Sequence, residues 1–173
     1  LFPMAVITIF WMHDIGLSMT EIFLLQAIFA GTMGLFEFPS GMLADRIGYR
    51  PSLVLASAIT LVGWLVYLFS PGFWTIAAAE ILLGVGLSLI SGTDSAMLYE
   101  SLVDSGDEAR FATWQGRSRF FGQAAEGSAA LLAGVLYAAW PRLPLVLQVG
   151  VWVVGLGVAL ALTEPARHRP RVA

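Results

Sequence analysis

The sequence of 173 residues contains no cysteine and no lysine, and it has few charged residues of any kind. Without cysteine the chain has no disulfides, no thiolate metal sites and no cysteine nucleophile. Charged residues make up 12% of the chain, against about 25% in an ordinary soluble domain. The net charge of −3 is spread over short connections, and all nine basic residues are arginine. This charge pattern does not indicate nucleic-acid binding.

Hydrophobic residues, by contrast, make up 58% of the chain, whereas about 45–50% is usual for a soluble domain. A soluble fold of this length has too little interior for that much apolar surface, because roughly a third of the surface of its chain stays in water. The hydrophobic residues also form continuous runs rather than alternating, which favours helices over strands. The composition therefore predicts an all-α, polytopic membrane protein.

Five of the hydrophobic runs are long enough to cross a bilayer, which takes roughly 20 helical residues. We place these spans near residues 20–40, 52–70, 73–99, 117–139 and 143–162. The opening LFPMAVITIFW is apolar but too short to cross, and we expect it to be the second half of a helix whose beginning is missing. Six helices, the first truncated, are thus expected within residues 1–164, with a polar segment at 165–173.

The arginines indicate how these helices are oriented. Counting connections alternately, eight of the nine arginines fall on one side of the membrane, and the ninth, Arg142, falls on the other. Because cytoplasmic connections carry an excess of arginine and lysine, we expect loop 41–51, connection 100–118 and the C-terminal tail to be cytoplasmic. The eight are Arg46, Arg50, Arg110, Arg117, Arg119, Arg167, Arg169 and Arg171.

Two helical stripes of small residues are expected to be packing seams, since small side chains let helix backbones approach closely. Each stripe repeats at steps of four, three and four residues, which keeps its members on one face. The first is Gly84, Ser88, Ser91 and Ser95, and the second is Gln123, Gly127, Ala130 and Gly134.

A polar island, GMLADRIGYRP, lies between the first two spans at residues 41–51. We expect Gly41 to end its helix without a side chain, so that another helix can press against it. Asp45 supplies a negative charge that suits the N-terminus of a helix, where free N–H groups and the helix dipole favour an anion. Gly48 allows a sharp turn. A simple helical hairpin, with Arg46 and Arg50 serving only topology, is the alternative.

The island resembles the motif between the second and third helices of the major facilitator superfamily of secondary transporters. It matches as Gly41-x-Leu43-Ala44-Asp45-Arg46-x-Gly48-x-Arg50-Pro51. The resemblance implies an inner latch, in which Gly41, Asp45 and Arg46 contact a helix of the second half of the transporter. Gly48 and Arg50 belong to the same motif, and Glu37, on the same helical stripe, is expected to join the latch.

The resemblance also implies the extent of the chain. Residues 1–164 would form the N-terminal half of the major facilitator fold, and residues 165–173 would begin the central cytoplasmic loop. The latch's partner helix lies in the missing C-terminal half, so the chain is expected to be a fragment. The stretches GLSMTEIFLLQAIFA and SGTDSAMLYESL resemble a bacterial group of the superfamily whose substrates are mostly unassigned.

Two departures from the family weaken an assignment as a proton-coupled drug antiporter. Such antiporters commonly carry an arginine four residues before a G-x-G in the fourth helix, but Glu80 precedes Gly84-Val85-Gly86 here. They also tend to carry a Gly-Pro pair in the fifth helix, and residues 117–139 contain no proline.

Acidic residues within the spans are candidate substrate or proton sites, because a carboxylate at membrane depth costs a few kcal/mol. Glu126 lies about nine residues into its span, or roughly 13 Å deep, the depth of transporter binding sites. Gln123 is one turn away and can share a polar pocket with it. Asp94 would line an inner gate. A structural role remains the alternative for Glu126 and for Asp94, and whether Glu80 faces a cavity or the outer surface stays open.

The sequence contains no catalytic constellation, no metal-ligand spacing and no cofactor motif, so we expect neither an enzyme nor a cofactor. The function expected is secondary active transport of a small molecule across the cell membrane by alternating access, with proton coupling as a hypothesis. A non-transporting membrane sensor or scaffold that kept the fold is the alternative. The expected partners are the lipid bilayer, a small-molecule substrate, protons and the missing C-terminal half.

Overall fold

The computed structural model describes Pro3 and residues 6–166, and the regular structure of that part is entirely helical. The all-α prediction is thereby confirmed. A π-helical turn, Trp11–Ile15, follows the first helix, and a 3₁₀ turn, Glu108–Arg110, precedes the fifth. The helices are α1 (Ile7–Phe10), α2 (Met19–Ile47), α3 (Tyr49–Leu68), α4 (Phe73–Asp104), α5 (Phe111–Ala139) and α6 (Leu143–Ala161).

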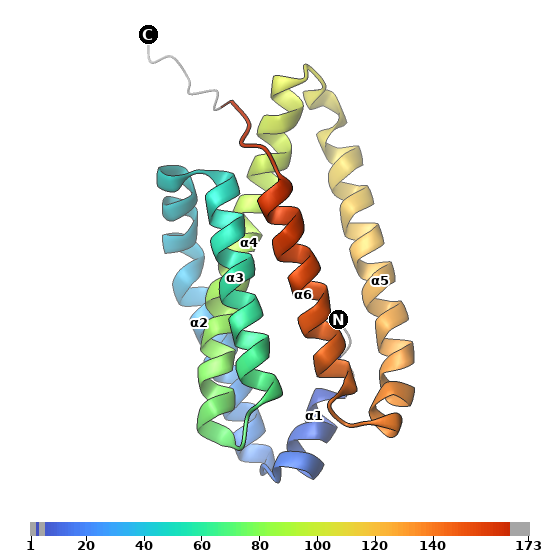
Figure 1. Cartoon of the computed structure of the whole chain (residues 1–173). Coiled ribbons are helices and arrows are strands. Elements are labelled where there is room, and N and C mark those ends of the chain that lie inside the picture. Colours follow the sequence, from blue (N-terminus) through green and yellow to red (C-terminus); the bar gives the residue numbers. More distant parts are fainter. Residues whose placement is uncertain (1–2, 4–5, 167–173) are drawn as a thin grey trace.

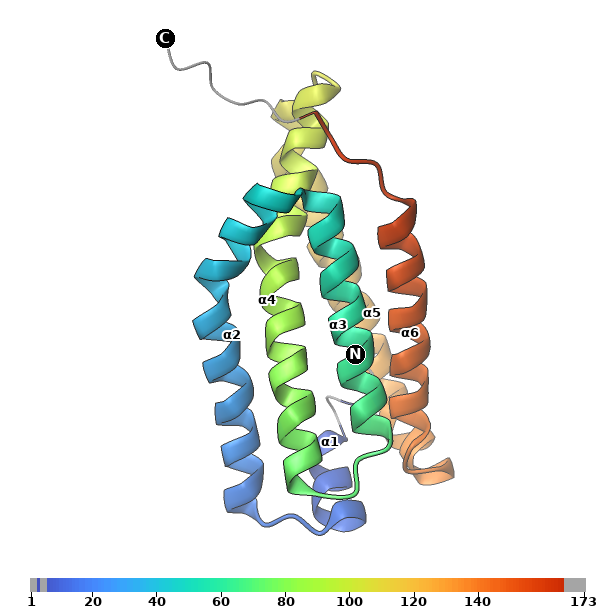
Figure 2. The same ribbon diagram turned by 60° about the vertical axis from the view of Figure 1, so that its left-hand side comes forward.

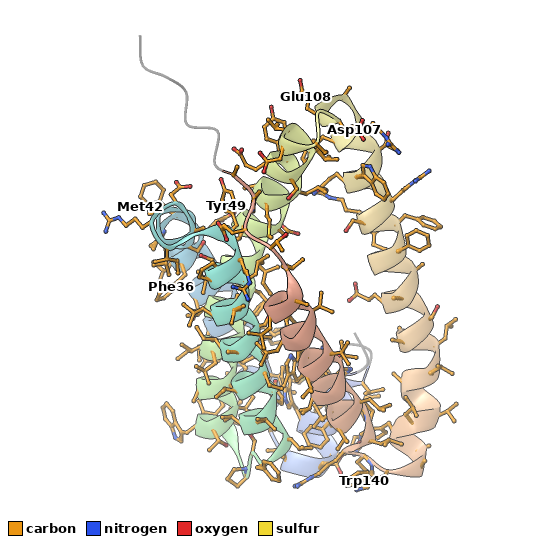
Figure 3. All side chains as sticks on the ribbon, turned by 45° about the horizontal axis from the view of Figure 1, so that its top comes forward. Phe36, Met42, Tyr49, Asp107, Glu108 and Trp140 are labelled. Carbon is orange, nitrogen blue, oxygen red and sulfur yellow. The ribbon has the colours of Figure 1, made fainter. Side chains whose placement is uncertain are left out.

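The five long helices run alternately up and down between two ends of the bundle (Figure 1). We name these the Gly48 end and the Trp140 end. Figure 3 shows Met42 and Tyr49 at the Gly48 end with Asp107 and Glu108, and it shows Trp140 at the other. The expected arginines of the tail, Arg167, Arg169 and Arg171, lie outside the described residues.

Local chemistry explains where α2 begins. The Ser18 hydroxyl accepts a hydrogen bond from the Glu21 amide at 3.3 Å, and the Glu21 carboxylate accepts one from the Ser18 amide at 2.8 Å. This reciprocal pair is a capping box, which satisfies two amides that the helix itself leaves without partners. Ser18 is therefore the N-cap of α2.

Four helices, α2, α3, α4 and α6, are long and apolar enough to cross a membrane. The sequence predicted a fifth full span at residues 117–139, but α5, which covers those residues, is not among the four. The helix is long enough, at 29 residues. The helix carries Arg117, Arg119, Gln123 and Glu126, however, and these polar residues lower its mean hydropathy.

Helix α4 is the centre of the bundle, packed against α2 on one side and α3 on the other (Figure 2). A Cβ atom added to Gly84 would lie 2.9 Å from Thr32 Cβ and 3.1 Å from the Phe29 carbonyl oxygen of α2. One turn later, the Ser40 hydroxyl donates a hydrogen bond to the Ser88 carbonyl at 3.0 Å. The expected seam is thus confirmed at Gly84 and Ser88, which are buried, whereas Ser91 is exposed.

The contact of α4 with α3 depends on Gly86. A Cβ atom there would overlap the Thr60 hydroxyl and would lie 3.1 Å from the Ala56 carbonyl oxygen. The same hydroxyl donates a hydrogen bond to that carbonyl at 2.8 Å, so it is held in place. Close approach of this kind suits helices in lipid, where van der Waals packing rather than water exclusion holds them together.

The second expected seam is wrong for the described part of the chain. Gln123, Gly127, Ala130 and Gly134 are all exposed, and the buried residues of α5 are Ala129 and Ala133 instead. The reason is the position of α5, which stands apart from α6 over most of its length (Figure 1). A stripe of small residues permits close packing, but it does not determine which face of the helix is used.

The outer surface of the bundle is strongly apolar. Leu131 on α5 is 84% exposed, and Trp74, at the Trp140 end, is 82% exposed. Phe69 and Trp140 are exposed at the same end. Aromatic side chains gathered at one level are typical of a membrane interface, where an apolar ring meets the headgroups.

The α3–α4 contact predicts opposite outcomes for two glycine substitutions. Gly86→Ala should destabilise the protein by about 1–3 kcal/mol, the usual cost of overpacking a core, because Thr60 and the α3 backbone leave no room. Gly127→Ala should be neutral or stabilising, since nothing lies within 4 Å of its Cβ position and alanine is the better helix former. Thermal unfolding in detergent, followed by circular dichroism, measures both. Equal melting temperatures for the two variants would contradict the proposed seam.

Candidate functional site

The polar island at residues 41–51 is almost wholly helical. Helix α2 continues to Ile47, α3 begins at Tyr49, and Gly48 alone joins them. The expectation that Gly41 ends its helix is therefore wrong. A glycine inside a helix costs only about 1 kcal/mol, and Met42, Leu43 and Ala44 after it favour continuation. Pro39 also lies inside α2, which bends in its C-terminal part (Figure 2).

The turn at Gly48 is held by a residue that the sequence analysis did not single out. The carboxylate of Glu164 accepts hydrogen bonds from the amides of Tyr49, at 2.7 Å, and Arg50, at 2.6 Å. Free amides and the helix dipole make the start of α3 a favourable place for an anion. Glu164 therefore supplies the N-terminal charge for α3.

Two further features fit this arrangement. The Arg50 guanidinium donates a hydrogen bond to the Leu160 carbonyl at 2.8 Å, so α3 is linked twice to the end of α6. Gly48 has φ +111°, and a Cβ atom there would lie 2.9 Å from a Glu164 carboxylate oxygen. Glycine is thus needed at this turn both for its backbone conformation and for space.

The stripe expected for the latch lies on one face of α2. Glu37, Gly41 and Asp45 are spaced four residues apart within the helix, which places them one above another. Glu37 and Asp45 are exposed, and Gly41 is half-buried. Arg46 is also exposed and lies with Pro51 and Glu164 beside a shallow pocket at the turn. The face around Glu37 and Asp45 is therefore largely open in the described structure.

The membrane acids singled out from sequence do not converge. Glu126 and Gln123 are exposed near the middle of α5. Asp94, on α4, lines an open groove of about 960 Å³ between α4 and α5, together with Trp114 and Arg117. Its carboxylate accepts a hydrogen bond from the Ser95 amide at 2.6 Å. The structure thus places Asp94 in a groove that Glu126 does not line.

A second polar centre surrounds Glu80, whose orientation the sequence left open. Glu80 is only 8% exposed, and its carboxylate accepts a hydrogen bond from the Tyr67 hydroxyl at 2.6 Å. Tyr67 packs against Trp64 and Trp11, with ring centroids 5.4 Å and 6.2 Å apart. Together these side chains border a cavity of about 290 Å³, which we call the Glu80 cavity.

A signal for this pair was present in the sequence. Tyr67 and Glu80 lie 13 residues apart, on either side of the short turn between α3 and α4. Antiparallel helices joined by a short turn bring such positions to the same level. The hydrophobic runs did not show which face of each helix points inward, so the spacing of Tyr67 and Glu80 did not by itself predict that the two side chains meet.

Comparison with protein families supplies the broader assignment. The sequence model of the family described as Major Facilitator Superfamily matches residues 1–173, which is the whole chain. The chain belongs to the Major Facilitator Superfamily. None of the curated proteins compared with it matches. Membership in this family indicates a multi-pass membrane transporter, with the bilayer and a small-molecule substrate as its partners, and it does not indicate an enzyme.

Within this Major Facilitator chain, the residues that the structure describes contain no group of three histidine, aspartate or glutamate side chains placed to hold a metal ion. The polar chemistry lies instead in single carboxylates. Glu164 is bound to backbone amides, Glu80 is bound to a phenol, and Glu126 and Asp94 lie on exposed surface. These environments differ enough to give the four carboxylates different roles.

The cap on α3 predicts a measurable loss when Glu164 is changed. Glu164→Ala should destabilise the protein by about 1 kcal/mol, a typical cost of losing a helix cap, and should speed amide exchange at Tyr49 and Arg50. Glu164→Gln keeps an acceptor oxygen but loses the charge, and should fall in between. Hydrogen exchange followed by mass spectrometry reports both effects. Unchanged exchange at the start of α3 in Glu164→Ala would refute the cap.

Proposed function

We propose that this chain forms the first of two six-helix halves of a secondary active transporter, which moves a small molecule across the cell membrane by alternating access. Residues 1–164 form the bundle, and residues 165–173 begin the connection to the second half. The observation that carries the proposal is the exposed stripe of Glu37, Gly41 and Asp45 on α2. A carboxylate that faces lipid is costly, so an exposed face of a membrane helix that carries two carboxylates suits contact with a second bundle.

The stripe and the turn act together in this proposal. Glu37, Gly41 and Asp45 contact a helix of the second half in one state of the transporter and release it in the other. Arg46 lies in the last turn of the same helix, just before the Gly48 turn. The cap by Glu164 and the link from Arg50 to α6 hold the turn rigid, so the latch moves with its own half. Rocking of two rigid halves about a central site is how such transporters alternate access.

Transport itself is tested with the complete protein in liposomes, using a panel of radiolabelled organic cations, amino acids and sugars. Accumulation of any member above that in protein-free liposomes supports the transporter. No accumulation by a folded, correctly inserted protein favours the alternative, a membrane sensor or scaffold that kept the fold.

The proposed orientation places the Gly48 end in the cytoplasm, because the predicted cytoplasmic connections carry eight of the nine arginines. The absence of native cysteine makes this directly measurable. A Met42→Cys variant should react with a membrane-impermeant maleimide only after the cells are permeabilised. A Trp140→Cys variant should react in intact cells, since Trp140 lies at the opposite end (Figure 3). The reverse labelling pattern would overturn the orientation.

For coupling we propose that protons act through Glu126, with Gln123 beside it and Asp94 nearer the Gly48 end. Glu126 lies near the middle of α5, a helix 29 residues long, and its side chain is exposed. A carboxylate at that depth is costly against lipid, so this face of α5 is expected to border a polar cavity between the two halves. Secondary transporters place coupling-ion sites at that level.

Neutralising Glu126 should therefore uncouple transport from protons. In the complete transporter, Glu126→Gln is expected to lower pH-driven accumulation at least about tenfold, equivalent to about 1.4 kcal/mol, while exchange of substrate without a pH gradient persists. Glu108→Gln, in the exposed turn before α5, is the matched control and should leave both activities unchanged. Unaltered pH-driven accumulation in Glu126→Gln would exclude Glu126 from coupling.

A further inference from the structure

We infer that the Glu80 cavity binds a small organic cation, of the quaternary ammonium class. The inference names a substrate class for the proposed transporter and depends on that function for its biological role, but binding can be measured without transport. The cavity lies between α1, α2, α3 and α4, close to the Trp140 end of the bundle. It is separate from the exposed stripe on α2 and from Glu126 on α5.

The first argument is charge. Glu80 is only 8% exposed, and its carboxylate accepts a hydrogen bond from the Tyr67 hydroxyl, which brings no positive charge. The chain has no arginine between Arg50 and Arg110, so α4 supplies no cation of its own. Arg110, in the turn at the opposite end of the bundle, pairs with Asp107. A buried carboxylate without a cation is costly, and a bound cation removes that cost.

The second argument is the aromatic wall. Trp11, Trp64 and Tyr67 are 2%, 4% and 1% exposed, and their rings pack together beside the carboxylate. The faces of aromatic rings carry negative potential, and cages of such rings bind quaternary ammonium groups, most strongly where water is excluded. Three large rings beside one carboxylate therefore favour a positively charged ligand over a neutral or anionic one.

The third argument is an unused donor. The indole N–H of Trp11 is buried beside the Tyr67 hydroxyl and makes no hydrogen bond of good geometry to the described residues. A buried donor without a well-formed hydrogen bond is uncommon in proteins and is costly. An oxygen atom on the ligand can accept this hydrogen bond. The amide of Gln26, which also lines the cavity, adds a second polar contact.

The volume of the Glu80 cavity narrows the class of ligand further. A volume of about 290 Å³ is at the lower limit for ligand pockets, which usually measure about 300–1,000 Å³. The cavity therefore suits a compact head group such as trimethylammonium, with a short arm that bears an oxygen. Choline has these features and is the probe that we choose.

The test compares choline with 3,3-dimethylbutan-1-ol, which has nearly the same shape but no charge. Binding to the purified chain in lipid nanodiscs is followed by tryptophan fluorescence, since two of the six tryptophans border the cavity. We expect choline to quench the fluorescence saturably, and the neutral alcohol neither to quench it nor to compete. Equal effects of the two compounds, or no saturable effect of choline, would overturn the inference. This comparison uses the wild-type chain alone, so it does not depend on a variant's folding.

Two variants locate the site. Glu80→Gln keeps an oxygen that can accept the Tyr67 hydrogen bond but removes the charge, and it should weaken choline binding at least about tenfold, or about 1.4 kcal/mol. Glu108→Gln removes a carboxylate from the exposed turn before α5, at the opposite end of the bundle, and should bind choline as the wild type does. Wild-type affinity in Glu80→Gln would overturn the proposal, because it would mean that Glu80 carries no charge that the ligand needs.

The choline-binding test and the transport test can fail independently of each other. Transport of another panel compound without choline binding would refute the cation site and leave the transporter intact. Choline binding without transport of any compound would support the site and count against transport.

Discussion

The close contact of α4 with its two neighbours is the interaction on which the rest of the structure depends. Inside a bilayer no water is displaced when helices meet, so they associate through packing and hydrogen bonds. Gly84 lets α4 approach α2, and Gly86 lets it approach α3 until a Cβ atom would no longer fit. This contact fixes the rotation of α4, and that rotation places Glu80 opposite Tyr67, whose ring packs against Trp11.

Polar groups in the bundle are satisfied by two kinds of partner. Serine and threonine hydroxyls mostly bond to a carbonyl one turn back on their own helix, as Ser52 and Thr60 do. Such local bonds meet the demand of an apolar surrounding without help from another element. Glu164 and Glu80 differ, because their partners lie on other elements, so each joins two parts of the chain. These two long-range bonds mark the two ends of the bundle.

Much of the fold follows from run length and composition. Continuous apolar runs of bilayer length leave helices as the structure that satisfies every backbone group within one segment, and Gly48 predicted the turn between α2 and α3. The extension of α2 past Gly41 was not predicted, because a single glycine weakens a helix by less than its neighbours stabilise it. The cap by Glu164 could not be predicted from the sequence either, since Glu164 and Tyr49 are 115 residues apart.

The sequence by itself determined an all-helical membrane bundle and a motif that resembles one transporter family. Only the tertiary structure decided which face of each helix points inward. The physical reason is that a membrane helix is apolar almost all round, so its pattern carries little record of orientation. The stripe of α5 from Gln123 to Gly134 therefore looked like a seam but lies exposed, and Glu80, whose orientation the pattern left open, lies buried among aromatic rings.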